Sequence, residues 1–185
     1  MEKFQLSGEL RAELGKKATK ETRANGLIPC VLYGGGDVKH FSVKEGDVRK
    51  LIYTPNIYIV ELTVGGKTVT AILKDLQVHP VKDNILHIDF LEVSAEKPVV
   101  IEIPVKLEGL AEGVKLGGKL VQQMRKLRVK GLYSNFPDRL IVNVENLGIG
   151  KTIQVGALSY DNLEVLNNPI NVVAAVKATR GSRNA

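Results

Sequence analysis

Residues 10–36, LRAELGKKATKETRANGLIPCVLYGGG, place a polar, basic segment directly before an apolar one. Two acids, Glu13 and Glu21, stand among five cations in its first half: Arg11, Lys16, Lys17, Lys20 and Arg23. The run 28–33 that follows is apolar, and three glycines close it. A segment too polar to bury, joined to one that must be buried, predicts a basic surface held on a rigid core. Phosphate is the natural partner of such a surface, and we expect RNA as its source.

The composition is that of a folded soluble protein. The 185 residues are 44% hydrophobic and 25% charged, which allows one large domain or two of about ninety residues. Tryptophan is absent and aromatic residues make up 5% of the chain, so the cores must be aliphatic. The net charge of +6 permits a nucleic-acid partner without establishing one.

One cysteine and the absence of long apolar runs bound the cell compartment. Cys30 alone excludes an internal disulfide framework and a multi-cysteine metal site, and we expect it to pack as a small buried residue. The N-terminal segment MEKFQLSGEL has no apolar core of a signal peptide, and no stretch is long enough for a membrane span. We therefore expect a soluble, cytoplasmic protein.

Strand signals dominate the first half. Alternating and apolar runs predict strands over residues 3–10, 28–33, 39–43, 56–64, 67–78 and 85–93. Gly65-Gly66 predicts a hairpin turn. One short helix is expected over 20–25, with Thr19 as its N-cap and Gly26 in the left-handed conformation after it. A second is expected over 44–53 and ends before Pro55.

Residues 94–98, SAEKP, break the pattern and are the expected linker. Beyond them, short β-rich runs alternate with glycine, Asn-Pro and Pro-Asp punctuation, and only 120–124 is a candidate helix. The predicted fold class is therefore mainly β. We expect one domain over residues 1–94, a second all-β domain over 95–178, and a disordered basic tail over 179–185.

The strand 85–91 carries a polar pair. Side chains alternate across a strand, so Leu86, Ile88 and Phe90 should share one face while His87 and Asp89 share the other, about 7 Å apart along the backbone. The pair can be a solvated strand face, a reader of RNA, or a catalytic dyad. Imidazole can donate to phosphate or a 2′-hydroxyl, and a carboxylate can accept from a base amine. No nucleophile motif accompanies them, which argues against an enzyme.

Other candidate sites have simpler interpretations. The three histidines lack metal-site spacing. Glycines 34–36 and the run 148–152, GIGKT, are predicted turns, because a phosphate-binding loop needs glycine where Glu145 stands. The alternating cations Lys126, Arg128 and Lys130 predict either a solvated strand face or a second contact to RNA or to a ribosomal protein.

Several motifs, taken together, resemble a known family. They are R-x4-K-x2-T-K-x2-R from Arg11 to Arg23, P-x3-YGG over 29–35, Q-x-HP over 77–80 and HIDF over 87–90. Over essentially its whole length the chain resembles the bacterial large-subunit ribosomal protein twenty-five family, in its long two-domain form, the general stress protein CTC type. The runs VIEIPVKLEG, GLAEGVKLGG and IVNVENLGIG resemble the second domain of that form.

The resemblance implies a six-stranded β-barrel with short helices, seated on the minor groove of 5S ribosomal RNA. The protein would be a non-enzymatic constituent of the large ribosomal subunit, at its central protuberance, supporting translation. It would need no cofactor and no metal, would not bind membranes, and would be monomeric away from the ribosome. Neighbouring ribosomal proteins are possible further partners.

The resemblance also implies the RNA-facing positions, which fall here on Arg11, Lys16, Thr19, Lys20, Arg23, Tyr33, Gln77, His87 and Asp89. The three residues Arg11, Lys20 and Arg23 would hold phosphates. Tyr33 would meet ribose, and His87 and Asp89 would meet sugar and base edges. Many members carry a basic residue in place of Glu21 and glycine in place of Lys17, so these two positions depart from the family pattern.

Two other classes of function stay open at this point. One is a β-rich adaptor that binds only other ribosomal proteins. The other is a hydrolase that uses the His87–Asp89 pair together with the turn 150–152.

Overall fold

The computed structural model describes residues 1–54 and 56–179 of the chain. The chain divides into two compact units, Met1–Lys97 and Pro98–Ala185, which are described separately below. Both are built mainly from strands, which confirms the predicted fold class. Apart from Thr179, the predicted disordered tail lies outside the described residues. No helix in the described part of the chain has the length and apolar character needed to cross a membrane.

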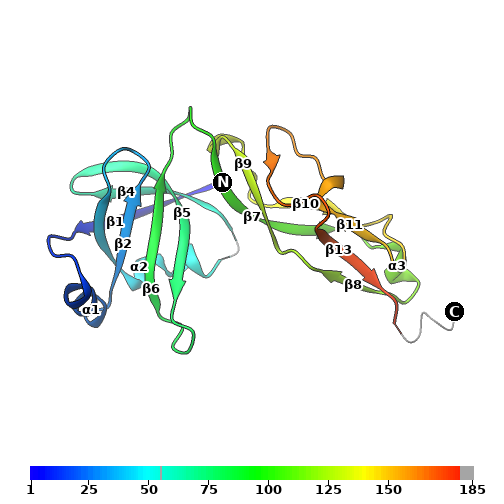
Figure 1. Ribbon diagram of the computed structural model, residues 1–185, viewed down its shortest axis with the longest axis horizontal. Coiled ribbons are helices and arrows are strands. Elements are labelled where there is room, and N and C mark those ends of the chain that lie inside the picture. The colour runs from blue at the N-terminus through cyan, green and yellow to red at the C-terminus, as the bar shows by residue number, and fades with distance from the viewer. Residues whose placement is uncertain (55, 180–185) are drawn as a thin grey trace. The chain divides into compact units, whose positions relative to one another are not determined.

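The first unit is a closed barrel of six strands in the order β1-β3-β2-β6-β5-β4, which confirms the expected architecture (Figure 1). Two of its strand pairs, β1 with β4 and β2 with β6, are parallel, and the others are antiparallel. Its elements are β1 (Glu2–Leu10), α1 (Lys16–Ala24), β2 (Leu27–Tyr33), β3 (Lys39–Lys44), α2 (Glu45–Ile52), β4 (Tyr58–Val64), β5 (Lys67–Val78) and β6 (Ile85–Glu92).

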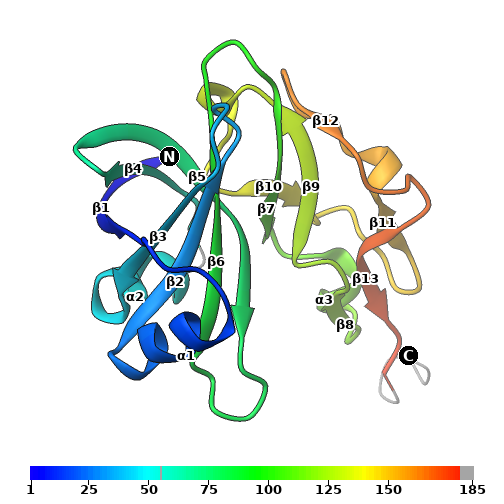
Figure 2. The same ribbon diagram turned by 60° about the vertical axis from the view of Figure 1, so that its left-hand side comes forward.

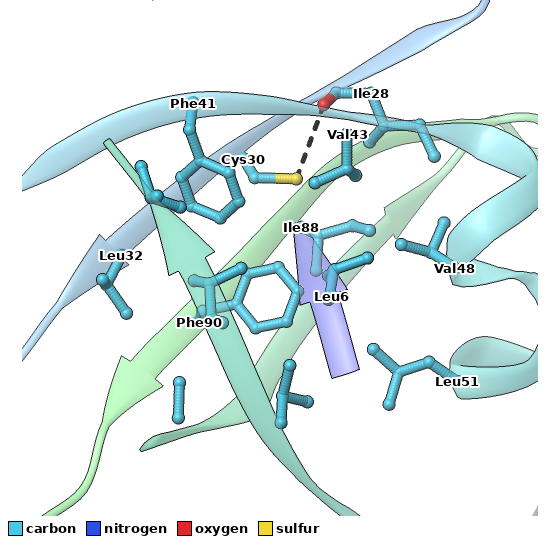
Figure 3. Packing of buried hydrophobic residues seen from close by; sticks show 14 of the residues in the cluster. Leu6, Ile28, Cys30, Leu32, Phe41, Val43, Val48, Leu51, Ile88 and Phe90 are labelled. Atoms are coloured by element: carbon cyan, nitrogen blue, oxygen red, sulfur yellow. Dashed lines mark hydrogen bonds between the residues drawn. The ribbon is translucent and has the colours of Figure 1, made fainter. Parts of the chain in front are cut away.

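The barrel interior is aliphatic around one aromatic pair. The rings of Phe41 and Phe90 are fully buried, with centroids 5.8 Å apart, and they lie among Val, Leu and Ile side chains (Figure 3). From α2, Val48 and Leu51 point into the same core. Cys30 is 1% exposed, as expected for a small buried residue. This core fixes the positions of the strands whose outer faces carry the polar residues.

The β5–β6 ladder changes register twice, and at each change the pairing skips one residue of one strand. Leu73 pairs with Phe90 and Asp75 with Asp89, so Lys74 is an extra residue in β5. On the other strand the pairing passes over Leu86, between Ile85 and His87. The prediction that Leu86 shares a face with Ile88 and Phe90 is therefore wrong. Ile85 is buried in its place, because the bulge shifts the alternation by one residue.

Helix α1 begins four residues earlier than the sequence suggested. Its first residue is Lys16 and Gly15 precedes it, with φ 111°. The N-cap assigned to Thr19 is wrong, because the Thr19 amide already donates to the Gly15 carbonyl at 3.0 Å within the helix. Gly26 follows the helix with φ 72°, as predicted. The Gly65-Gly66 hairpin is also confirmed, with φ 59° and 77°.

The second unit contains two sheets, one of four strands in the order β10-β7-β9-β12 and one of three in the order β11-β13-β8. Figure 2 shows the same strands from a second direction. The elements are β7 (Val99–Glu108), α3 (Glu112–Lys115), β8 (Lys119–Gln122), β9 (Lys126–Gly131), η1 (Tyr133–Asn135), β10 (Leu140–Asn143), β11 (Thr152–Gln154), η2 (Val155–Ala157), β12 (Glu164–Val165) and β13 (Val172–Lys177).

The one helix suggested for the second half was misplaced. Residues 119–122 form β8, which pairs with β13 through Val121 and Ala175. The helix is instead the single turn α3, too short to produce a helical repeat of apolar residues. The turn predicted over 148–152 occurs at 148–151, where Gly150 has φ 77° and the Lys151 amide donates to the Gly148 carbonyl at 3.2 Å, and Thr152 is already the first residue of β11.

Candidate nucleic-acid interface

Helix α1 carries a stripe of cations on one side. Lys16, Lys20 and Arg23 are spaced i, i+4 and i+7, so they project within about 60° of one another around the helix axis. No residue of α1 is buried, and all three cations are exposed. Neither lysine makes an ion pair with any residue of the described chain. The stripe is therefore an uncompensated positive surface.

The two departures from the family pattern lie away from this stripe. Lys17 is rotated from Lys16 by about 100° and Glu21 by about 140°. Glu21 is interspersed with the cations in the sequence but projects from another side of the helix. It therefore weakens the positive field of the stripe at a distance and does not pair with the cations.

Arg23 fastens α1 to the barrel. Its Nε and Nη2 atoms both donate to the carbonyl oxygen of Leu86, at 3.0 and 2.8 Å. That carbonyl belongs to the bulge residue that the β5–β6 ladder passes over. Two of the donor groups of the guanidinium are thus occupied by the fold, and only its remaining edge is open to a phosphate. Arg23 is first of all a positioning residue.

Arg11 fastens the other side of the helix. Its backbone amide donates to the carbonyl of His40 on β3 at 3.0 Å, and its Nη2 donates to Thr19 Oγ1 at 3.2 Å. Thr19 thus serves as a partner of Arg11 and not as a cap. The end of β1, α1 and β3 are joined at this point. The basic segment is therefore held in place at both ends.

The second part of the surface is the outer face of β2, β6 and β5. Parallel pairing places Val31 beside Asp89, and antiparallel pairing places Asp89 beside Asp75 and His87 beside Gln77. Ile88 and Phe90 face the core, so His87 and Asp89 face outward. His87 and Asp89 thus share the outward face, as predicted, and Gln77 stands beside them on the neighbouring strand.

His87 and Asp89 form a defined pair. His87 Nδ1 and Asp89 Oδ1 are 2.7 Å apart, and the two side chains are 27% and 29% exposed. In the neutral imidazole this bond assigns the proton to Nδ1, which leaves Nε2 as an outward acceptor. The second oxygen of the Asp89 carboxylate is left for a further donor. The pair therefore presents two acceptors in a fixed orientation.

Tyr33 lies beside this pair. Burial, and then the carboxylates of Asp89 and Asp75, raise the pKa of Tyr33 above its ordinary value of 10.0. Its hydroxyl therefore stays protonated and can donate a hydrogen bond. The pKa of the buried Cys30 thiol is raised, mainly by burial and further by the Asp89 carboxylate, while the positive charge of Arg11 opposes this rise. The charges of Arg11 and Asp89 thus influence the same point of β2 from different elements.

Asp75 was missed at the level of the sequence. It stands opposite Asp89 because the bulge at Lys74 turns it outward. The signal that could have revealed it is the spacing of Leu73 and Leu76. Both pack against the core although they are three residues apart, which is incompatible with an unbroken strand.

All nine predicted positions lie on the first unit, in two groups that the Arg23–Leu86 bond connects. One group is on and around α1, and the other is on the outer faces of β2, β5 and β6. In residues 1–54 and 56–179 no group of three or more His, Cys, Asp or Glu side chains is placed to hold a metal ion. The group around α1 thus offers positive charges to an anion, and the group on β2, β5 and β6 offers oriented hydrogen-bonding side chains beside them.

Fold and surface together define a mainly β, two-unit protein with a cationic and hydrogen-bonding face on its barrel. Residues 6–90 match the model of the Ribosomal L25p family, and residues 98–180 match that of the C-terminal domain of ribosomal protein TL5. The chain belongs to the L25p family of ribosomal proteins, in a form with both domains.

Relatives that match this chain over most of their own length share the name large ribosomal subunit protein bL25. The large ribosomal subunit protein bL25 of Azobacteroides pseudotrichonymphae genomovar. CFP2 is 60% identical over 185 residues, covering 100% of this chain and 98% of the relative. The protein of that name from Bacteroides fragilis (strain YCH46) is 59% identical over 169 residues, covering 91% and 86%. In Porphyromonas gingivalis the identity is 56% over 187 residues, covering 100% and 97%. These relatives are named as ribosomal proteins and not as enzymes, so the hydrolase alternative is set aside.

Proposed function

We propose that this chain is a structural protein of the large ribosomal subunit, and that its first unit, within residues 1–94, binds 5S ribosomal RNA. The bond between Arg23 and the Leu86 carbonyl carries the proposal, because it joins a row of cations to the His87–Asp89 strand as one surface. Membership of the ribosomal family supports the ribosome as its setting. The protein would then act in the cytoplasm, on the ribosome.

The two groups contribute different terms to binding. Arg11, Lys16, Lys20 and the open edge of Arg23 neutralise phosphates, which supplies most of the affinity and makes it dependent on salt. For four such contacts the logarithm of the binding constant should fall against the logarithm of the salt concentration with a slope of about −3 to −4.

The strand face supplies the selectivity. His87 Nε2 can accept from a ribose 2′-hydroxyl, which DNA lacks, and the free oxygen of Asp89 can accept from a base amine. Tyr33 can donate to a ribose or phosphate oxygen. An acid beside RNA is unfavourable unless it accepts such a bond, so Asp89 is the residue whose removal is most informative.

The test is the binding of full-length protein to a labelled 5S rRNA fragment that contains the internal loop. Asp89→Ala should weaken binding by roughly 1–3 kcal/mol, as expected for a reader of a base edge. The matched control is Asp47→Ala, which removes the same charge from the exposed side of α2. By simple electrostatics this control should leave affinity for a polyanion unchanged or slightly higher.

The sign of the Asp89→Ala effect decides the result. If the variant binds as tightly as the native protein, or more tightly, Asp89 acts only as a negative charge and the proposed reading surface is wrong. An unrelated RNA hairpin of the same length should bind more weakly than the 5S fragment. It should also lose little affinity on the Asp89 substitution.

A further inference from the structure

Two lysines of the second unit face each other across neighbouring strands. Antiparallel pairing of β8 with β13 places Lys119 directly opposite Lys177, and both side chains are exposed. Residues so paired project from the same face with Cβ atoms about 5 Å apart, and like charges in this position are destabilising. Because no acid in the described part of the chain pairs with these two lysines, their repulsion points to an anionic partner outside the fold.

Two more lysines flank this pair. Lys115 is the last residue of α3, which packs against β8. Lys151 lies in the turn before β11, on the other side of β13, where its carbonyl accepts from the Val176 amide at 3.2 Å. Figures 1 and 2 both show α3, β8 and β13 side by side. Four lysines from four segments thus gather at one end of the three-stranded sheet.

Close backbone packing holds these segments together. Gly113 and Gly118 lie against the Val176 side chain, and a Cβ on Gly113 would stand 2.7 Å from the backbone carbon of Gly148. Only glycine lets α3 and the start of β8 come this near to β13. Thr179 Oγ1 also donates to the Gly117 carbonyl at 2.7 Å. Direct packing therefore holds together the backbone segments that carry these lysines.

None of the four lysines at this end is in an ion pair within residues 1–54 and 56–179. Two acids near this end, Glu112 and Glu145, are joined through their backbones by a 2.9 Å hydrogen bond, from the Glu112 amide to the Glu145 carbonyl. Neither makes an ion pair with Lys115, Lys119, Lys151 or Lys177 within residues 1–54 and 56–179.

The cation stripe of β9 is different. There Lys130 lies 3.4 Å from Glu164, and Glu102 pairs in register with Arg128. Each of these two cations thus has an acidic neighbour on the same sheet. Lys126, the third cation of this stripe, pairs in register with Pro104, so the β9 stripe has acidic neighbours at two of its three positions.

We propose that Lys115, Lys119, Lys151 and Lys177 form a second RNA-binding surface that holds backbone phosphates, independent of the surface on the first unit. Ammonium groups bind phosphate as point charges and need no fixed fork geometry. The cluster contains neither arginine nor an aromatic side chain, the residue types that dominate protein–protein contacts. RNA is therefore favoured over an acidic protein as the partner.

The test uses the full chain with Lys16→Ala and Lys20→Ala, so that the first unit contributes less to RNA binding. The probe is a fluorescently labelled RNA duplex of mixed sequence, titrated between about 50 and 200 mM salt. Adding Lys119→Ala and Lys177→Ala should make the salt slope shallower by about two units, one for each lost phosphate contact. The matched control adds Arg128→Ala and Lys130→Ala, which removes the same charge from the same unit and should leave the slope unchanged.

Each outcome decides the assignment. An unchanged slope on loss of Lys119 and Lys177, or an equal change in both pairs, overturns it. A poly-glutamate peptide that competes as well as unlabelled RNA at equal charge also overturns it, because the surface would then be a general site for acidic chains. Loss of 5S rRNA selectivity on the Asp89 substitution bears on the first unit alone, so the two proposals can fail separately.

A further variant guards against a trivial folding defect. Lys177→Glu places an acid opposite Lys119, so the melting temperature should rise while RNA binding falls. Increased stability together with lost affinity supports a surface kept for binding at the expense of stability. If the variant binds the duplex as well as its parent does, the proposal is wrong.

Discussion

Substituting Arg23 separates two roles that a cation in this position can have. If Arg23 only holds a phosphate, then Arg23→Lys keeps the charge and should bind RNA almost as well as the native protein. If it fastens α1 to β6, then Arg23→Lys should resemble Arg23→Ala, because an ammonium cannot reproduce the two donors, Nε and Nη2, that converge on the Leu86 carbonyl. We expect the second result.

The size of the effect follows from what holds the helix. Helix α1 has nine residues, no side-chain cap and no buried residue, and a helix of this length is marginal by itself. A hydrogen bond with a charged partner contributes about 1.5–3 kcal/mol, and the exposure of this one reduces the value to about 1 kcal/mol. Opening of α1 should therefore become about fivefold more frequent in either variant.

Hydrogen exchange of the free protein measures this directly. The amides of residues 19–25, which bond within α1, should lose about fivefold protection in Arg23→Lys and Arg23→Ala, while the barrel amides stay protected. Binding to the 5S rRNA fragment should weaken by at most a similar factor, since only the molecules whose helix is open must reorder it in the complex. The control is Lys20→Ala, which should make the salt slope shallower by about one unit without altering exchange in α1. Native exchange rates in Arg23→Lys, together with native affinity, would refute the positioning role.

Two further predictions concern stability. Gly113→Ala should lower the free energy of unfolding in urea by about 1–3 kcal/mol, because the new Cβ would meet the backbone at Gly148. The control is Gly46→Ala in α2, which has open space around the new Cβ and should be neutral or stabilising. Equal effects of the two substitutions would contradict the packing argument. Burial raises the pKa of Cys30, so its contribution to stability is complete below the unfolded value of 9.0 and is lost as the pH rises above it. The free energy of unfolding of Cys30→Ala should then depend less on pH in the alkaline range than that of the native chain. An unchanged pH dependence would contradict a raised pKa of Cys30 in the folded protein.

The barrel was predictable because its signals are local. Six runs with alternating or continuous apolar residues became the six strands, and Gly65-Gly66 has the positive φ angles that its turn requires. The start of α1 was not predicted, because threonine favours the N-cap position and Thr19 was therefore assigned to it in place of Gly15. Lys16, Lys17 and Ala18 are good helix formers, and they extend the helix back to that glycine.

The second unit was harder to predict because its elements are short and its pairings distant in sequence. Strand β8 has four residues, and only its partner β13, some fifty positions later, makes it a strand. Helix α3 also has four residues, too few to show a period. Its position depends on the contact of Gly113 with the turn at Gly148, which no local pattern reveals.

On the candidate site, the residues were predicted but the reason for their placement was not. Counting alternate residues from Leu73, which packs on the core, would turn Gln77 inward. The extra residue Lys74 reverses this, so Gln77 stands outward beside His87 and Asp75 beside Asp89. The resemblance to a family predicted Gln77 as an RNA-facing residue but gave no structural reason for its outward orientation. The bulge supplies the mechanism.

The second bulge explains why the two groups of the site occur together. By passing over Leu86, the ladder lets Ile85 fill the core while His87 and Asp89 keep their outward positions. The same irregularity leaves the Leu86 carbonyl unpaired in the ladder and directed to Arg23, which would otherwise have no anchor on the barrel. Removing the bulge would turn Ile85 outward and also remove the Arg23 anchor of α1. The cations and the reading strand are therefore not two sites that happen to be adjacent. One backbone irregularity fixes the orientation of both, so a change to either should be felt by the other.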